Sequence, residues 1–114
     1  MRILVIDDDK NIRYFISGYL VTAGYEVIEA QDGQEGIDVL KADDDIHMVI
    51  TDIRMPDKDG NDVVRYVRQS YTSKNIPVVA ITGYPDDAEG DLFTRLFEKP
   101  FKMKDLVKVM KSFE

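Results

Sequence analysis

The chain has 114 residues, 44% hydrophobic and 32% charged, a composition that fits one soluble globular domain over residues 1–114. The absence of cysteine excludes disulfides, thiolate chemistry and cysteine-bound metals. The formal net charge of -7 argues against direct nucleic-acid binding, which needs a basic surface. No apolar stretch reaches the length of a membrane span, and Met1 leads almost directly into the first predicted strand. We therefore expect a cytoplasmic domain, either free-standing or the first part of a longer protein.

Short apolar runs bounded by turn residues predict five strands. In chain order they cover residues 3–6, 25–30, 48–51, 78–81 and 95–98. The first, third and fourth runs are apolar throughout and should lie in the centre of a sheet. The second and fifth contain or adjoin charged residues, so they suit its edges.

Apolar residues at helical spacing predict helices between the strands and after the last one. The predicted apolar faces are Ile12, Phe15, Ile16, Tyr19, Leu20 and Ala23, then Gly36, Ile37 and Leu40, then Val63, Val64 and Val67, and finally Met103, Leu106, Val107, Met110 and Phe113. Asp9 or Asn11 can cap the first helix and Gly24 can end it, and the third helix opens near Gly60. Tyrosines and methionines at this spacing are interpreted as core.

Strands that alternate with helices predict an α/β fold, a doubly wound parallel sheet covered on both faces. Right-handed crossovers then favour the strand order 2-1-3-4-5, in which the winding direction reverses between the first and third strands. Open sheets of this kind bind ligands at the carboxyl ends of their strands, at the point of reversal.

Polar residues with complementary chemistry follow four of the predicted strands. Asp7 and Asp8 follow the first strand, Asp52 the third, Thr82 the fourth and Lys99 the fifth. A single Asp after a strand is usually a helix cap or a turn residue. Independent turn residues have no reason to converge on one sheet edge, however, so the joint pattern indicates a functional site.

Carboxylates at close range repel one another unless one is protonated or a cation neutralises them. Mg²⁺ prefers such oxygen ligands, and we expect Asp8 and Asp52 to bind it directly, Asp7 to hold a metal-bound water, and the backbone carbonyl of Arg54 to complete the set. A carboxylate can also attack phosphorus. The cation, Lys99 and Thr82 would then contact the transferred phosphoryl oxygens.

Two other motifs have simpler interpretations. Residues 57–60 superficially resemble a calcium loop, but that alignment puts Met55 at the first ligand position and Tyr66 where a bidentate Glu belongs. His47 precedes the third strand, so we expect it on the surface at the end of the sheet opposite the site.

The motifs ILVIDDD, MVITDIRMPDKDG, VVAITGY and FEKPF together resemble the response-regulator receiver domain, a flavodoxin-like fold, from Met1 to Glu114. By this resemblance Asp52 is the phosphoacceptor, Asp7 and Asp8 are the metal-binding pair, Thr82 is the switch hydroxyl and Lys99 contacts the phosphate. The resemblance also implies a cis peptide bond between Lys99 and Pro100.

The chain departs from this family between Thr82 and Lys99. Leu96 occupies a position that is usually aromatic, and the segment is several residues shorter than usual. It is also acidic and contains Gly90, which costs about 1 kcal/mol inside a helix. We predict that the fourth helix is short, frayed or replaced by a mobile loop, and that the partner recognises a remodelled surface.

The favoured function is a magnesium-dependent phosphoacceptor switch of a two-component phosphorelay. A sensor histidine kinase or a phosphotransfer protein would supply the phosphoryl group, and an unknown downstream protein would read the phosphorylated state. We expect a signalling switch that catalyses only its own phosphorylation and dephosphorylation. A phosphorylation-independent interaction module is the alternative, and a metal-dependent phosphohydrolase is disfavoured because Arg54 stands where a second acid–base group would be needed.

Overall fold

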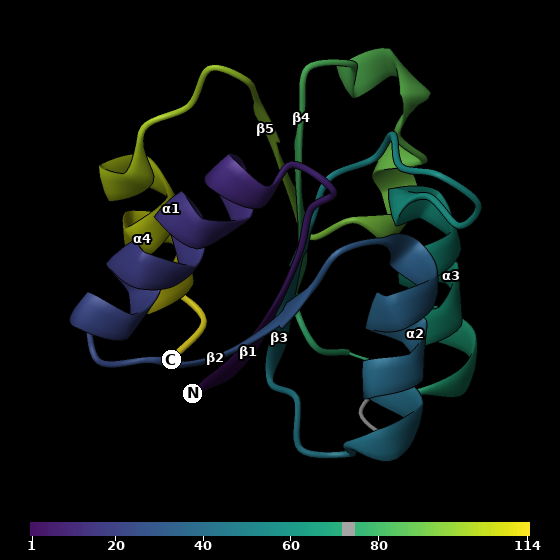
Figure 1. Ribbon diagram of the computed structural model, residues 1–114, viewed down its shortest axis with the longest axis horizontal. Helices are drawn as coiled ribbons and strands as arrows, with labels where there is room; N and C mark the ends of the chain where they lie inside the picture. Colours follow the sequence, from purple (N-terminus) through teal and green to yellow (C-terminus); the bar gives the residue numbers. More distant parts are fainter. Residues whose placement is uncertain (72–74) are drawn as a thin grey trace.

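The computed structural model describes residues 1–71 and 75–114, and it has a five-stranded parallel sheet at its centre (Figure 1). The strands are β1 (Arg2–Ile6), β2 (Glu26–Ala30), β3 (Met48–Thr51), β4 (Val78–Thr82) and β5 (Arg95–Glu98). Their order in the sheet is β2-β1-β3-β4-β5, which confirms the predicted topology, with the two charged strands at the edges.

Helices cover both faces of the sheet and enclose two hydrophobic cores. They are α1 (Lys10–Thr22), α2 (Gly33–Ala42), α3 (Gly60–Ser70) and α4 (Met103–Lys111). Helices α1 and α4 lie on one face and α2 and α3 on the other (Figure 1). The apolar strands β1, β3 and β4 contribute alternate side chains to the two cores, so their burial stabilises both layers.

Aspartate side chains cap the first three helices. Asp9 accepts hydrogen bonds from the backbone N–H groups of Asn11 and Ile12, at 2.9 and 3.2 Å, so Asp9 is the cap of α1. Asp32 caps α2, and Asp59 forms a capping box at the start of α3. These side chains satisfy N–H groups that have no partner inside the helix.

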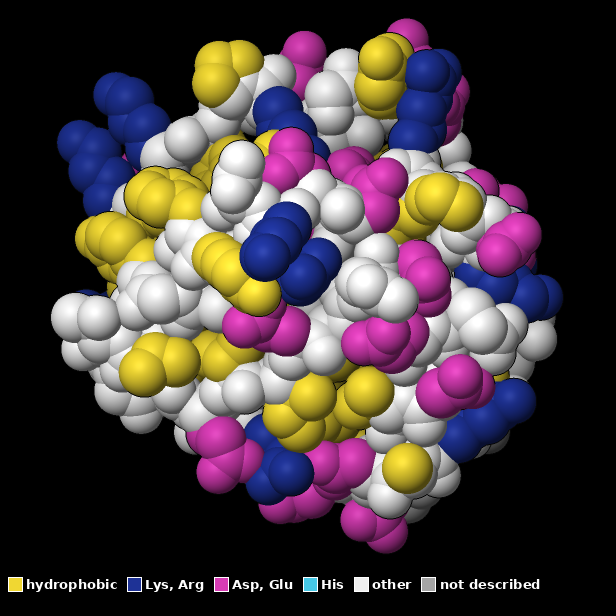
Figure 2. Space-filling view, in the orientation of Figure 1, with side chains coloured by type: hydrophobic (Ala, Val, Ile, Leu, Met, Phe, Trp, Pro, Cys, Tyr) yellow, Lys and Arg dark blue, Asp and Glu magenta, His cyan; other side chains and the backbone are white. Residues whose placement is uncertain are grey.

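The predicted apolar face of α1 is partly wrong. Its fully buried residues are Ile16, Ser17 and Leu20, whereas Phe15 and Tyr19 are 60% and 43% exposed. The buried positions 16, 17 and 20 cover one side of the helix, and at about 100° per residue positions 15 and 19 both lie roughly 100° or more from the middle of that side, so they face away from the sheet. Hydrophobic side chains accordingly lie open on the α1 side of the molecule (Figure 2).

The chain between β4 and β5 contains no α-helix, as predicted. It forms two short 3₁₀ turns, η1 (Pro85–Asp87) and η2 (Gly90–Leu92), joined by extended residues. Phe93 follows them and is buried in the core beneath α3, while Leu96 on β5 is 37% exposed. The element labelled α4 is therefore the last helix of the chain, after β5.

Candidate functional site

The register of the sheet brings the predicted site residues together at the edge formed by the carboxyl ends of the strands. Ile6, the last residue of β1, is opposite Thr51, the last of β3, so Asp7 and Asp52 leave the sheet side by side. Thr82 is opposite Glu98 at the ends of β4 and β5, which places Lys99 at the same edge. The backbone N–H of Lys99 donates to the carbonyl of Thr82 at 2.8 Å.

Three carboxylates converge at this edge. One carboxylate oxygen from each of Asp7, Asp8 and Asp52 lies within 4.8 Å of the others. Asp7 is buried, Asp52 is half-buried and Asp8 is exposed. The group is thus open to solvent on the Asp8 side and enclosed by protein on the Asp7 side.

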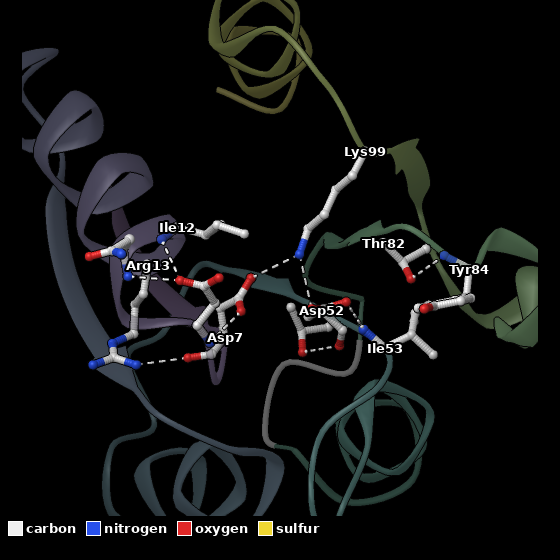
Figure 3. A network of polar contacts seen from close by, with 11 residues as sticks. Asp7, Ile12, Arg13, Asp52, Ile53, Thr82, Tyr84 and Lys99 are labelled. Carbon is white, nitrogen blue, oxygen red and sulfur yellow. Dashed lines mark hydrogen bonds and ion pairs between the residues drawn. The ribbon is translucent and has the colours of Figure 1, made fainter.

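Lys99 points from the end of β5 across the edge toward these carboxylates (Figure 3). Its Nζ lies 3.0 Å from Oδ2 of Asp52 and 3.4 Å from Oδ2 of Asp7. Burial alone would lower the pKa of Lys99, but the hydrogen bond to Asp52 and the two negative charges outweigh it and raise that pKa. The peptide bond between Lys99 and Pro100 is cis, as predicted.

Asp7 is the most enclosed carboxylate of the site. Its Oδ1 accepts a hydrogen bond from the backbone N–H of Asp9 at 2.9 Å, and Arg13 donates to its backbone carbonyl at 2.8 Å. Burial is the largest influence on the Asp7 carboxyl and raises its pKa, although Lys99 and the Asp9 hydrogen bond oppose it. A cation beside Asp7 would relieve this unfavourable burial of charge.

Thr82 is fully buried at the end of β4. Its hydroxyl oxygen accepts a hydrogen bond from the backbone N–H of Tyr84 at 2.9 Å (Figure 3). Because a threonine hydroxyl can donate as well as accept, this hydrogen bond leaves the proton of the Thr82 hydroxyl free to be donated.

Side-chain contacts also link the loop after β3 and the start of α3 to the segment after β4. The guanidinium of Arg54 lies 3.4 Å from the centre of the Tyr84 ring, and its Nε donates to Asp87 at 2.6 Å. Asn61, at the start of α3, bonds to the backbone of Asp87 and Glu89. The backbone carbonyl of Arg54 as a metal ligand stays a prediction.

His47 lies away from this edge, as expected. Its Nδ1 accepts a hydrogen bond from the backbone N–H of Arg2 at 2.9 Å, at the opposite end of β1 from Asp7. Its Nε2 is 3.3 Å from Asp45. His47 therefore has no part in the carboxylate site.

The donor set of the site fits Mg²⁺. Mg²⁺ takes oxygen ligands at about 2.0–2.1 Å, so two ligands on opposite sides of one ion are about 4 Å apart. The carboxylate oxygens of Asp7, Asp8 and Asp52 have mutual distances within 4.8 Å, so small side-chain movements would bring them into that range. The exposed side of the site leaves room for the waters that Mg²⁺ retains.

Comparison with known proteins gives one consistent answer. Residues 3–111 match the family model described as "Response regulator receiver domain". The chain is 35% identical to Response regulator RR06 of Streptococcus pneumoniae, over 98% of this chain and 52% of that protein. It is 40% identical to Chemotaxis protein CheY1 of Helicobacter pylori, over 78% of this chain and 73% of that protein. The chain thus spans about half of the first relative.

Solved structures agree with these matches. The response regulator protein TrrA from Thermotoga maritima, in complex with Mg²⁺-BeF, superposes with a TM-score of 0.88 and is 28% identical, covering 99% of this chain and 98% of that one. The chemotaxis response regulator CheY4 of Vibrio cholerae gives a TM-score of 0.87, also at 28% identity, covering 99% and 98% of the two chains. Among the described residues, none of the helices has the length and hydrophobicity to span a membrane. With the family match, the sheet order and the acidic cluster in agreement, the chain belongs to the response regulator receiver domain family.

Proposed function

We propose that this domain is a magnesium-dependent phosphoacceptor switch and that Asp52 receives the phosphoryl group. The observation that carries the proposal is the meeting of Asp52 with two further carboxylates and with the Lys99 ammonium, 3.0 Å away, at one sheet edge. The donor is the phosphohistidine of a sensor kinase or of a phosphotransfer protein. The receiver family and the acidic cluster support this assignment.

In the transfer, an oxygen of the Asp52 carboxylate forms a bond to phosphorus as the P–N bond of the donor breaks and the leaving imidazole takes up a proton. Lys99 is placed to contact the oxygens of the arriving phosphoryl group, since its Nζ already lies beside Asp52. The Thr82 hydroxyl donates a hydrogen bond to the same group. When Mg²⁺ is bound, Asp7, Asp8 and Asp52 would hold it, and it would supply positive charge to offset the added negative charge.

The domain then hydrolyses its own aspartyl phosphate. It thus catalyses only its own phosphorylation and dephosphorylation. Water can reach the site because Asp8 is exposed and 12% of the Asp52 side-chain surface remains open. A downstream protein reads the phosphorylated state. The surface that it recognises includes the remodelled segment between β4 and β5, because this segment contains the residues that follow Thr82.

The alternative is an interaction module that keeps the fold and needs no phosphorylation. The complete set of Asp7, Asp8, Asp52, Thr82 and Lys99 argues against it. A small-molecule phosphohydrolase would need a second acid–base group next to Asp52, and the Arg54 side chain instead pairs with Asp87 and stacks on Tyr84.

Incubation with acetyl phosphate and Mg²⁺, followed by intact-mass measurement, separates the three functions. A switch gains the mass of one phosphoryl group and loses it slowly. An interaction module gains no mass with or without Mg²⁺, and a phosphohydrolase consumes acetyl phosphate over many turnovers without retaining the group. Omission of Mg²⁺ is the control, and equal labelling in its absence would contradict the proposed metal dependence.

A further inference from the structure

The segment between β4 and β5, residues 83–94, has little structure of its own. Its first turn is closed by backbone hydrogen bonds from Asp87 to Tyr84 and from Ala88 to Pro85, at 3.0 and 3.2 Å. Short 3₁₀ turns have poorer hydrogen-bond geometry than an α-helix. The position of this segment over the site must therefore come from its contacts with the rest of the domain.

One buried side chain holds the middle of this segment. Asn61, only 8% exposed, donates from Nδ2 to the carbonyl of Asp87 at 2.8 Å and accepts at Oδ1 from the N–H of Glu89 at 2.9 Å. The NH₂ group and the oxygen of the Asn61 amide thus each satisfy one backbone group, and these two groups belong to residues two positions apart. Loss of this side chain would leave both backbone groups without these partners.

The neighbouring ion pairs cannot replace Asn61. Arg54 pairs with Asp87, but their side chains are 58% and 41% exposed. Arg65 pairs with Glu89, and their side chains are 38% and 45% exposed. Ion pairs that are open to solvent contribute little, because water screens them and ordering long side chains costs entropy. Asn61 is therefore the main polar anchor of residues 87–89, beside the packing of Ala88 against the core.

Asn61 is itself placed by the residue that precedes it. The N–H of Gly60 donates to the carbonyl of Ile53 at 2.8 Å, and a Cβ at position 60 would lie 2.2 Å from the carbonyl oxygen of Asp52. The first turn of α3 thus rests on the backbone of Asp52. The segment that Asn61 holds also contacts Thr82, because the N–H of Tyr84 donates to the Thr82 hydroxyl.

We propose that Asn61 is a positioning residue for phosphoryl transfer. It fixes the turn from Tyr84 to Asp87 relative to the loop that begins with Asp52, and the N–H of Tyr84 in turn donates to the Thr82 hydroxyl. Asn61 therefore acts through Thr82 and touches neither the phosphoryl group nor the metal. This inference rests on the proposed function, and it assigns to a side chain of α3 the task of placing the Thr82 hydroxyl.

The test measures binding of beryllofluoride, a phosphoryl mimic, in the presence of Mg²⁺. Asn61→Ala should weaken beryllofluoride binding by about five- to tenfold, the effect of losing the one hydrogen bond that the Thr82 hydroxyl donates to beryllofluoride. The affinity for Mg²⁺ alone should stay within about twofold of the wild-type value. Asn11→Ala, which alters an exposed amide on α1, is the matched control and should change neither affinity. A general loss of packing would instead weaken both.

A double-mutant cycle with Thr82→Ala shows whether Asn61 acts through Thr82. If it does, the double variant binds beryllofluoride no more weakly than Thr82→Ala alone. Losses that multiply, or an Asn61→Ala variant that binds like wild type, would overturn the proposal.

Amide exchange of the wild-type protein gives a result that needs no variant. The Glu89 amide should exchange slowly because Asn61 holds it, and exchange as fast as that of an open chain would also overturn the proposal. A wild-type protein that fails to bind beryllofluoride would contradict the proposed function instead, and Glu89 exchange would still test the anchor itself.

Discussion

Replacement of Gly60 by alanine tests the contact between α3 and the backbone of Asp52. The added Cβ would lie 2.2 Å from the Asp52 carbonyl oxygen and 3.0 Å from Cα of Ile53, so the first turn of α3 must move by about 1 Å to restore an ordinary contact. Such overpacking against backbone costs about 1–3 kcal/mol. We expect the free energy of unfolding, measured in urea, to fall by this amount.

Gly18→Ala is the matched control because Gly18 is exposed within α1 and a Cβ there would meet no atom within 4 Å. Alanine at this position should raise the free energy of unfolding by about 0.5–1 kcal/mol, since glycine loses more backbone entropy in a helix. A Gly60→Ala protein as stable as wild type would refute the close contact between α3 and Asp52. If both substitutions changed the free energy of unfolding equally, the space around each added Cβ could not explain the effect.

Two further predictions concern Tyr71 and Lys99. The Tyr71 hydroxyl donates to the carbonyl of Asp43 at 2.6 Å and accepts from the N–H of Ile46 at 2.9 Å, so Tyr71→Phe should lower the free energy of unfolding by about 1–3 kcal/mol. Burial raises the pKa of Tyr71 above its ordinary value of 10.0, so this stability is intact below pH 10 and is lost as pH rises through the folded-state pKa. Urea unfolding should show a steeper alkaline loss for wild type than for Tyr71→Phe, and parallel curves would contradict this. Lys99→Ala removes a cation that lies 3.0 Å from Asp52 and would repel Mg²⁺, so calorimetry should show several-fold tighter binding of Mg²⁺ alone. Binding of beryllofluoride should become weaker, because the ammonium that contacts it is lost. Unchanged affinities would contradict the assigned position of Lys99.

The strand order and the composition of the site could be predicted because both follow from local patterns. Continuous apolar runs indicate the central strands, and the residue after each run must emerge at the carboxyl edge of a parallel sheet. The missing helix between β4 and β5 could also be predicted, because Pro85, Gly90 and the acidic residues between them disfavour one.

The errors arose where tertiary contacts decide. The period of α1 identifies an apolar stripe, but Phe15 and Tyr19 lie at its margin, and only packing against the sheet and α4 decides which residues are buried. Asn61 could not be recognised, because its partners Asp87 and Glu89 are 26 and 28 residues away in the chain. In the sequence it is one more polar residue in the first turn of a helix.

The most direct test of the central claim is the intact mass of Asp52→Asn after incubation with acetyl phosphate and Mg²⁺. Asp57→Asn is the matched control, since Asp57 is an exposed aspartate of the same loop. We predict that wild type and Asp57→Asn gain one phosphoryl group and that Asp52→Asn gains none. Labelling of Asp52→Asn to the wild-type level would show that Asp52 is not the phosphoacceptor.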